Sequence, residues 1–158
     1  MLSVPLFRQR VSLLLGSKRN SAMPTIRILV VDDHEIVRRA ICSLLHSQPD
    51  LQVIGEASDG LEAVKRAEEE HPDVVVLDIR MPELSGLEAA RRICQVAPGT
   101  EILLFLSQHD SPEVVQEALS TGARGYVVKS EVASDLIAAV RAVGQEKQFL
   151  SARVAAHG

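Results

Sequence analysis

The sequence predicts a three-layer α/β/α sandwich built on a five-stranded parallel sheet with the strand order 2-1-3-4-5. Five short runs rich in Val, Ile and Leu mostly lack alternation with polar residues, which is typical of strands buried on both faces. A segment with helical spacing of apolar residues follows each run, and this alternation favours a parallel sheet covered by helices. Right-handed crossovers can cover both faces only if the strand order reverses once, between the first and third strands.

The predicted strands and helices form five consecutive βα units. The strands are expected at residues 26–31, 51–57, 74–77, 101–106 and 125–128. The first helix carries an apolar stripe over residues 36–45, and further helices are expected at residues 60–70, 86–95, 111–120 and 131–145. The segment Ser111-Pro112-Glu113 has the composition of a helix start: a capping hydroxyl, a proline in the first position and an acid in the first turn.

Composition indicates one cytoplasmic domain with an aliphatic core. The length of 158 residues suits one ordinary domain with a short extension, and hydrophobic residues make up 46% of the chain but aromatic residues only 3%. No apolar run approaches the ~20 residues that span a bilayer. Cys42 and Cys94 form no CxxC pair, which indicates reduced thiols. Their helices are expected on opposite faces of the sheet, so no disulfide should form.

The charge distribution separates a basic extension from an acidic body. Residues 1–22 contain four basic residues and no acid, which leaves 13 basic and 21 acidic residues, a net charge of −8, in the other 136. An acidic body argues against direct binding to nucleic acid. We expect residues 1–23 to be a disordered extension, although their composition partly resembles a transit peptide. Residues 24–147 form the expected domain, and residues 148–158 a tail or a truncated linker.

Polar side chains directly follow four of the five predicted strands. Asp32 and Asp33 come after the first strand, Asp78 after the third, Ser107 after the fourth and Lys129 after the fifth. The carboxyl ends of parallel strands share one edge of the sheet, and ligands bind there beside the point where the strand order reverses. The sequence therefore predicts that three carboxylates, a hydroxyl and an ammonium group meet in one crevice.

Single members of this set also have simpler explanations. Asp33 could merely cap the first helix, and Ser107 could be an ordinary loop hydroxyl. Asp78 caps no helix, because the next one begins near Gly86, and an unpaired acid at the centre of a sheet is costly. Lys129 precedes a helix N-terminus, the unfavourable end of the helix dipole for a cation, which indicates an anionic partner.

The predicted cluster suits phosphoryl transfer to a carboxylate. Three neighbouring carboxylates repel one another, and a hard divalent cation, Mg²⁺ or Mn²⁺, would relieve this repulsion. Lys129 and Ser107 would bind the remaining phosphoryl oxygens. A carboxylate nucleophile such as Asp78 can form an acyl phosphate, and positioning with charge neutralisation supplies most of the catalysis.

Four segments carry a resemblance to a known family. Residues 30–34 read Val-Val-Asp-Asp-His, residues 77–82 read Leu-Asp-Ile-Arg-Met-Pro and are followed by Gly86, residues 106–107 read Leu-Ser, and residues 125–129 read Gly-Tyr-Val-Val-Lys. Together they resemble the receiver domain of two-component response regulators, and most of all the receivers that precede LuxR-type helix-turn-helix domains. The resemblance runs from about residue 26 to residue 149 and implies a flavodoxin-like fold.

The resemblance implies a role for each matching position of the site. Asp78 would be the phosphoacceptor. Asp32 and Asp33 would hold Mg²⁺ together with Asp78 and the backbone carbonyl of Arg80, and Lys129 would pair with the phosphoryl group. The implied donor is the phosphohistidine of a sensor histidine kinase or phosphotransfer protein, so the chain would not be a classical enzyme.

The resemblance also implies a switch and a downstream partner. Ser107 would be the switch hydroxyl and Tyr126 the switch aromatic, whose ring would turn inward when a phosphoryl oxygen draws Ser107 toward Asp78. Arg80 and His109 occupy positions that tune the lifetime of the phosphoryl group. The signal would pass to a protein effector or to a second copy of the chain, without contact to nucleic acid or membrane.

Departures from the family pattern and rival functions limit these expectations. Ser107 replaces the commoner Thr, and Ser130 stands where many receivers have Pro, so no cis peptide is expected after Lys129. Residues 149–154 resemble the start of a linker to an output domain, which leaves a stand-alone or a truncated receiver.

A phosphohydrolase with an Asp nucleophile would need a lid over its substrate. A flavodoxin-like redox domain would need a phosphate-binding loop and more aromatics, and a vestigial interaction module would neither bind Mg²⁺ nor accept phosphate.

Overall fold

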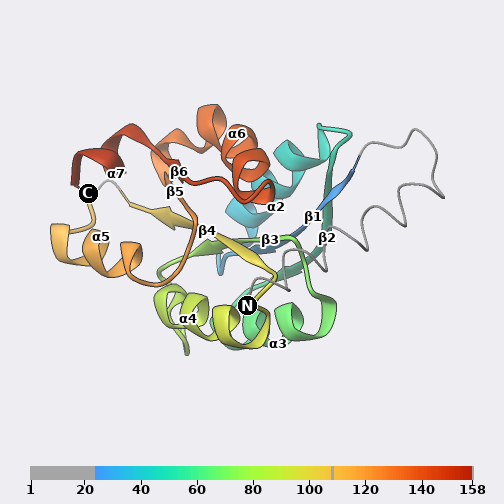
Figure 1. The fold of residues 1–158 in the computed structure, drawn as a ribbon, viewed down its shortest axis with the longest axis horizontal. Coiled ribbons are helices and arrows are strands. Elements are labelled where there is room, and N and C mark those ends of the chain that lie inside the picture. Colours follow the sequence, from blue (N-terminus) through green and yellow to red (C-terminus); the bar gives the residue numbers. More distant parts are fainter. Residues whose placement is uncertain (1–23, 108, 158) are drawn as a thin grey trace.

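Six parallel strands form one sheet in the order β2-β1-β3-β4-β5-β6 (Figure 1). The structure, a computed structural model, describes residues 24–107 and 109–157. The elements are, in chain order, β1 (Ile26–Val31), α2 (Glu35–His46), β2 (Leu51–Ala57), α3 (Gly60–Glu70), β3 (Val74–Asp78), α4 (Gly86–Val96), β4 (Glu101–Leu106), α5 (Pro112–Leu119), β5 (Gly125–Val128), a 3₁₀ turn η1 (Lys129–Glu131), α6 (Val132–Gly144), β6 (Phe149–Leu150) and α7 (Ala152–His157). The predicted α/β/α sandwich and the predicted order of its first five strands are confirmed.

The four strands β1, β3, β4 and β5 are apolar on both faces because both faces are covered. Along β1, Ile28 and Val30 pack beneath α2 and α6, whereas Leu29 and Val31 pack against α3 and α4. Figure 1 shows α2 and α6 above the sheet and α3 and α4 below it. This two-sided burial explains the continuous runs of Val, Ile and Leu in the sequence.

The two cysteines lie in different layers, as predicted. Cys42 on α2 belongs to the core between the sheet and α6, and Cys94 on α4 packs against the core on the opposite face. Both thiols are free. The sheet that separates them makes an internal disulfide impossible without rearranging the fold.

The sixth strand was not predicted. The two residues of β6 pair in parallel with β5, Phe149 opposite Gly125 and Leu150 opposite Tyr126. The following helix, α7, buries Val154 in the core shared with α3, α4 and α5. Figure 1 shows α7 close to α5 at the far end of the molecule from β2. Residues 149–157 were expected to be a tail or a truncated linker. They instead add the strand β6 to the sheet and the helix α7 to the layer that contains α3, α4 and α5.

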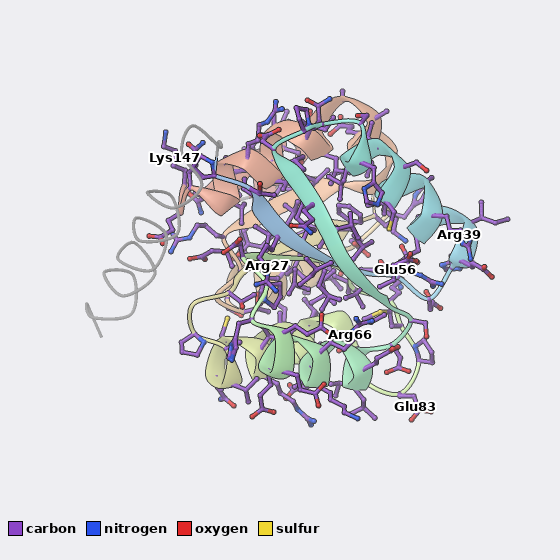
Figure 2. All side chains as sticks on the ribbon, turned by 90° about the vertical axis from the view of Figure 1, so that its right-hand side faces the viewer. Arg27, Arg39, Glu56, Arg66, Glu83 and Lys147 are labelled. Atoms are coloured by element: carbon purple, nitrogen blue, oxygen red, sulfur yellow. The ribbon has the colours of Figure 1, made fainter. Side chains whose placement is uncertain are left out.

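The opposite edge of the sheet is shielded by an arginine. Arg66 on α3 lies over Gly55 of the edge strand β2, where an added Cβ would stand 2.4 Å from its Nη2 atom. Its Nη1 donates a hydrogen bond of 2.7 Å to the carbonyl oxygen of Glu56. Figure 2, which faces this edge, shows Arg66 between α3 and the strand. A cation over an unpaired edge disfavours pairing with another chain.

Three further expectations concern the chain as a whole. The described residues contain no cis peptide bond, which agrees with the expectation for Lys129 and Ser130. None of the helices in the described part of the chain has the length and apolarity needed to cross a bilayer. The expected disordered extension, residues 1–23, lies outside the described residues.

Candidate functional site

The predicted carboxylates meet at the carboxyl end of the sheet. Asp32 follows β1 and Asp78 ends β3, and their exposed fractions are only 0% and 2%. Asp33 and His34, the next two residues of the first connection, are exposed. Ligand atoms of these four residues lie within 4.8 Å of one another. The three aspartates that were predicted from strand ends are thus brought together.

Lys129 supplies a cation to the two buried carboxylates. Its Nζ lies 3.1 Å from Asp78 Oδ2 and 3.7 Å from Asp32 Oδ2. Both Oδ2 atoms are buried and lack a well-directed hydrogen bond from the described residues, so the contact with the ammonium group is an ion pair. One positive charge faces two buried negative charges, which leaves the site with an excess of negative charge.

The pKa of Asp78 reflects its burial first and the neighbouring charges second. Burial raises the pKa of the Asp78 carboxyl above its ordinary value, and the nearby charge of Asp32 adds to the rise. The ammonium group of Lys129 and a hydrogen bond from the backbone of Arg80 lower the pKa but do not cancel the rise. A divalent cation would relieve the same repulsion, and carboxylate oxygens without hydrogen bonds are the ligands Mg²⁺ takes. The donor set therefore fits Mg²⁺.

Two residues that sequence reasoning missed hold the turn after β1. The Arg38 guanidinium, on α2, donates hydrogen bonds of 2.8 Å to the carbonyl oxygen of Asp32 and to Glu56 Oε1. Glu56 belongs to β2, so this arginine ties the turn to the neighbouring strand. Its only sequence signal is a basic residue one turn into an amphipathic helix, which is common on helices without any such role.

His34 orients the acidic pair. Its backbone N–H donates a 2.8 Å hydrogen bond to Asp32 Oδ1, and its Nδ1 lies 3.3 Å from the same atom and 3.1 Å from Asp33 Oδ1. The residue was noted in the sequence only as part of the acidic motif. Because Mg²⁺ prefers oxygen ligands, the imidazole suits a supporting role beside the metal rather than coordination.

Gly86 lets α4 begin directly behind Asp78. A Cβ on this residue would stand 2.0 Å from the carbonyl oxygen of Asp78 and 2.7 Å from the Cα of Ile79. The Gly86 N–H donates a 2.7 Å hydrogen bond to the Ile79 carbonyl oxygen. The glycine thereby fixes the position of the connection between β3 and α4, residues 79–85, against the end of the strand.

Ser107 lies in a tightly bonded turn after β4. Its Oγ accepts a 3.1 Å hydrogen bond from the His109 N–H, and its own N–H donates a 2.6 Å hydrogen bond to Asp110 Oδ2. The Arg80 guanidinium pairs with the same carboxylate. Arg80 and His109 are thus close to the site, but the Arg80 side chain is directed to Asp110, which sequence reasoning did not single out. A short polar residue three positions after Ser107 resembles an ordinary turn residue.

The Tyr126 ring is already inside the protein. It is 1% exposed, its hydroxyl donates a 2.7 Å hydrogen bond to the carbonyl oxygen of Ala123, and burial raises its pKa. The sequence-based expectation was that the ring turns inward when Asp78 carries a phosphoryl group. In this structure the inward position needs no phosphoryl group.

Comparisons with known proteins agree on one family. The family model described as the response regulator receiver domain matches residues 28–141. The transcriptional regulatory protein LiaR of Bacillus subtilis (strain 168) is 38% identical over 130 residues, which cover 82% of this chain and 61% of the relative. The DNA-binding transcriptional activator DevR/DosR of Mycobacterium tuberculosis is 40% identical over 131 residues, which cover 83% and 60%. The chain thus spans about three-fifths of these relatives.

Solved structures give the same fold. A LuxR-family two-component response regulator from Aurantimonas sp. SI85-9A1 superposes with a TM-score of 0.78 at 36% identity, covering 84% of this chain and 94% of that one. The response regulator domain of Thermotoga maritima CheB superposes with a TM-score of 0.71 at 37% identity, covering 77% and 97%.

Proposed function

Because the chain belongs to the receiver-domain family of two-component response regulators, we propose that Asp78 accepts a phosphoryl group from the phosphohistidine of a kinase or phosphotransfer protein. Members of this family are signalling proteins and not classical enzymes. The observation that carries the proposal is the environment of Asp78: a buried carboxylate at the end of β3, paired with Lys129 and next to two further aspartates.

The proposed reaction uses the carboxylate of Asp78 as the nucleophile. A carboxylate oxygen forms a bond to phosphorus while the bond between phosphorus and the imidazole nitrogen breaks, and the imidazole keeps the electron pair. Asp32, Asp33, Asp78 and the backbone carbonyl of Arg80 would hold Mg²⁺, which when bound neutralises charge on the phosphoryl oxygens. The site needs no general base, because an ionised carboxylate has no proton to lose.

Lys129 has two successive partners in this scheme. Before transfer, its ammonium group holds the two buried carboxylates. Once Asp78 carries a phosphoryl group as an acyl phosphate, the negative charge lies on the phosphoryl oxygens, and Lys129 pairs with one of them. The side chain is about one-third exposed, so the short movement from carboxylate to phosphoryl oxygen meets little packing resistance.

Output is proposed to pass through the face made by α5, β5 and α7. The Ser107 hydroxyl would donate to a phosphoryl oxygen, which changes the connection that leads into α5. The backbone carbonyl of Tyr126 in β5 accepts a 3.0 Å hydrogen bond from the Ser151 N–H, which joins β5 to the segment before α7. A protein effector or a second copy of the chain that prefers the phosphorylated shape would stabilise it.

A metal-dependence experiment tests the proposal. Acetyl phosphate should phosphorylate the chain only when Mg²⁺ or Mn²⁺ is present, and Asp33→Ala should abolish both metal binding and phosphorylation. Glu35→Ala is the matched control, because Glu35 is an exposed acid two residues away that pairs with Arg39 at 3.1 Å. Undiminished phosphorylation of Asp33→Ala would contradict the proposed metal site.

A further inference from the structure

We propose that Asp110 is a positioning residue that holds Ser107 in its resting place through a latch with Arg80. The latch opens when the phosphoryl group on Asp78 attracts the arginine. The inference rests on the proposed function of Asp78 and names the device by which its phosphorylation reaches the connection between β4 and α5.

The side chain of Asp110 is buried although the residue lies in a surface connection. Its side chain is 1% exposed. Oδ2 accepts the Ser107 N–H at 2.6 Å, and the backbone N–H of Asp110 donates to the Ser107 carbonyl oxygen at 3.1 Å. Asp110 therefore forms hydrogen bonds with both the backbone N–H and the backbone carbonyl of Ser107. The other carboxylate oxygen, Oδ1, accepts a hydrogen bond from the Arg80 guanidinium.

The latch joins two connections that both border the site. Arg80 stands two residues after Asp78 in the connection between β3 and α4, whereas Asp110 stands just before the Ser111 cap of α5. The two partners differ in their freedom to move. The Arg80 side chain is 68% exposed and can turn away without losing packing, but the Asp110 carboxylate can leave only if its connection opens.

A phosphoryl group on Asp78 competes with Asp110 for the arginine. It carries nearly two negative charges at neutral pH and three acceptor oxygens, which a guanidinium binds strongly. When Arg80 turns to these oxygens, Asp110 is left as a buried carboxylate without its cation. Such a charge is costly, so the connection opens to expose it.

Opening of the connection frees the switch hydroxyl. Ser107 Oγ accepts the His109 N–H at 3.1 Å in the resting turn, so the turn engages this hydroxyl before any phosphoryl group is present. Once the backbone bonds to Asp110 are lost, Ser107 can donate to a phosphoryl oxygen. The phosphoryl group thus acts on Ser107 twice, through direct attraction and through removal of the latch.

Linkage makes the proposal measurable. If phosphorylation opens the latch, then the closed latch weakens the binding of a phosphoryl analogue. Removal of the latch must therefore tighten that binding by the factor by which the latch had weakened it. Asp110→Asn keeps the size of the side chain and an acceptor for the Ser107 N–H but removes the charge that holds Arg80. At fixed Mg²⁺ and fluoride, the beryllium concentration that half-saturates the chain as beryllofluoride should fall about fivefold or more.

Amide NMR gives a second readout that altered stability alone would not move. In unliganded Asp110→Asn, the Ser107 and His109 signals should shift toward their positions in the beryllofluoride-bound parent. Arg80→Gln changes an exposed side chain and should produce the same shift, whereas Arg80→Lys keeps a cation and should largely restore the parent spectrum. Glu113→Gln removes an exposed charge from the first turn of α5 and serves as the matched control.

The double variant decides whether the latch is the cause. In an Arg80→Gln background, Asp110→Asn should leave the beryllofluoride affinity unchanged, because no latch remains to be broken. An unchanged affinity in Asp110→Asn alone, or an equal gain in both backgrounds, would overturn the latch. Absence of binding at Asp78 in the parent chain would instead overturn the proposed function, so the two failures are distinguishable.

Discussion

Removal of the Lys129 ammonium group should destabilise the metal-free protein and spare the metal-bound one. Lys129→Met keeps most of the length and of the apolar stem of the side chain but leaves Asp32 and Asp78 buried without their cation. The ion pairs act against a repulsion between the two carboxylates. The stability that is lost with these ion pairs therefore measures the repulsion between the two buried carboxylates that Lys129 offsets.

The distances set the magnitude. With an effective dielectric constant of about 20, attraction to the ammonium group is about 5 kcal/mol at 3.1 Å and about 4 kcal/mol at 3.7 Å. Ligand atoms of the two carboxylates lie within 4.8 Å, which corresponds to a repulsion of about 3 kcal/mol. Because a third of the Lys129 side chain is exposed, solvent screening and the hydration of the free ammonium group reduce the loss. We expect a net loss of about 2 kcal/mol, below the range for fully buried pairs.

Urea unfolding with and without Mg²⁺ provides the assay. Without the metal, the free energy of unfolding of Lys129→Met should fall by about 2 kcal/mol, and saturating Mg²⁺ should recover most of it because the cation replaces the missing charge. Asp78→Asn should also rescue the variant. Lys65→Met, on the exposed face of α3, is the control and should change little. A loss that neither Mg²⁺ nor Asp78→Asn repairs would refute the electrostatic account of the site.

Three further predictions concern other parts of the structure. Gly86→Ala should lower the free energy of unfolding by about 1–3 kcal/mol and impair phosphorylation, because its Cβ would stand 2.0 Å from the Asp78 carbonyl oxygen; an unchanged urea midpoint would contradict the close approach. The folded pKa of Asp78 is raised above the unfolded value of 3.8, so the folded state binds more protons between the two values and this group's contribution to stability falls as pH rises through that window. Asp78→Asn should remove that part of the pH dependence, and urea midpoints measured across the window would show whether it does. Val154→Asp should release α7 from α5 and speed amide exchange in residues 149–157, since a buried carboxylate cannot be hydrated there; unchanged exchange would show that Val154 does not anchor the helix.

The fold was predictable where burial leaves a pattern in the sequence. Four of the five longer strands are largely buried on both faces, so their apolar runs stand out, and the βα alternation then leaves few topologies. The strand β6 has only Phe149 and Leu150, too few residues for any periodicity. Its position beside β5 depends on contacts that no local pattern encodes.

The site was predictable where residues follow strands and not where they act across connections. Asp32, Asp78 and Lys129 follow from the common edge of a parallel sheet, and their distances agree with that expectation. The partnership of Arg80 with Asp110 joins residues 30 positions apart, and that of Arg38 with Glu56 joins residues 18 apart. Such pairs arise from the approach of two elements in space, so neither partner stands out in the sequence.

Mapping of the phosphorylated residue tests the central claim most directly. The parent chain and Asp78→Asn are incubated with acetyl phosphate and Mg²⁺, and intact and peptide masses are compared. The account predicts the addition of one phosphoryl group to the parent, localised to the peptide that contains Asp78, and none to the variant. Equal labelling of Asp78→Asn and the parent would contradict the assignment of Asp78 as the phosphoacceptor.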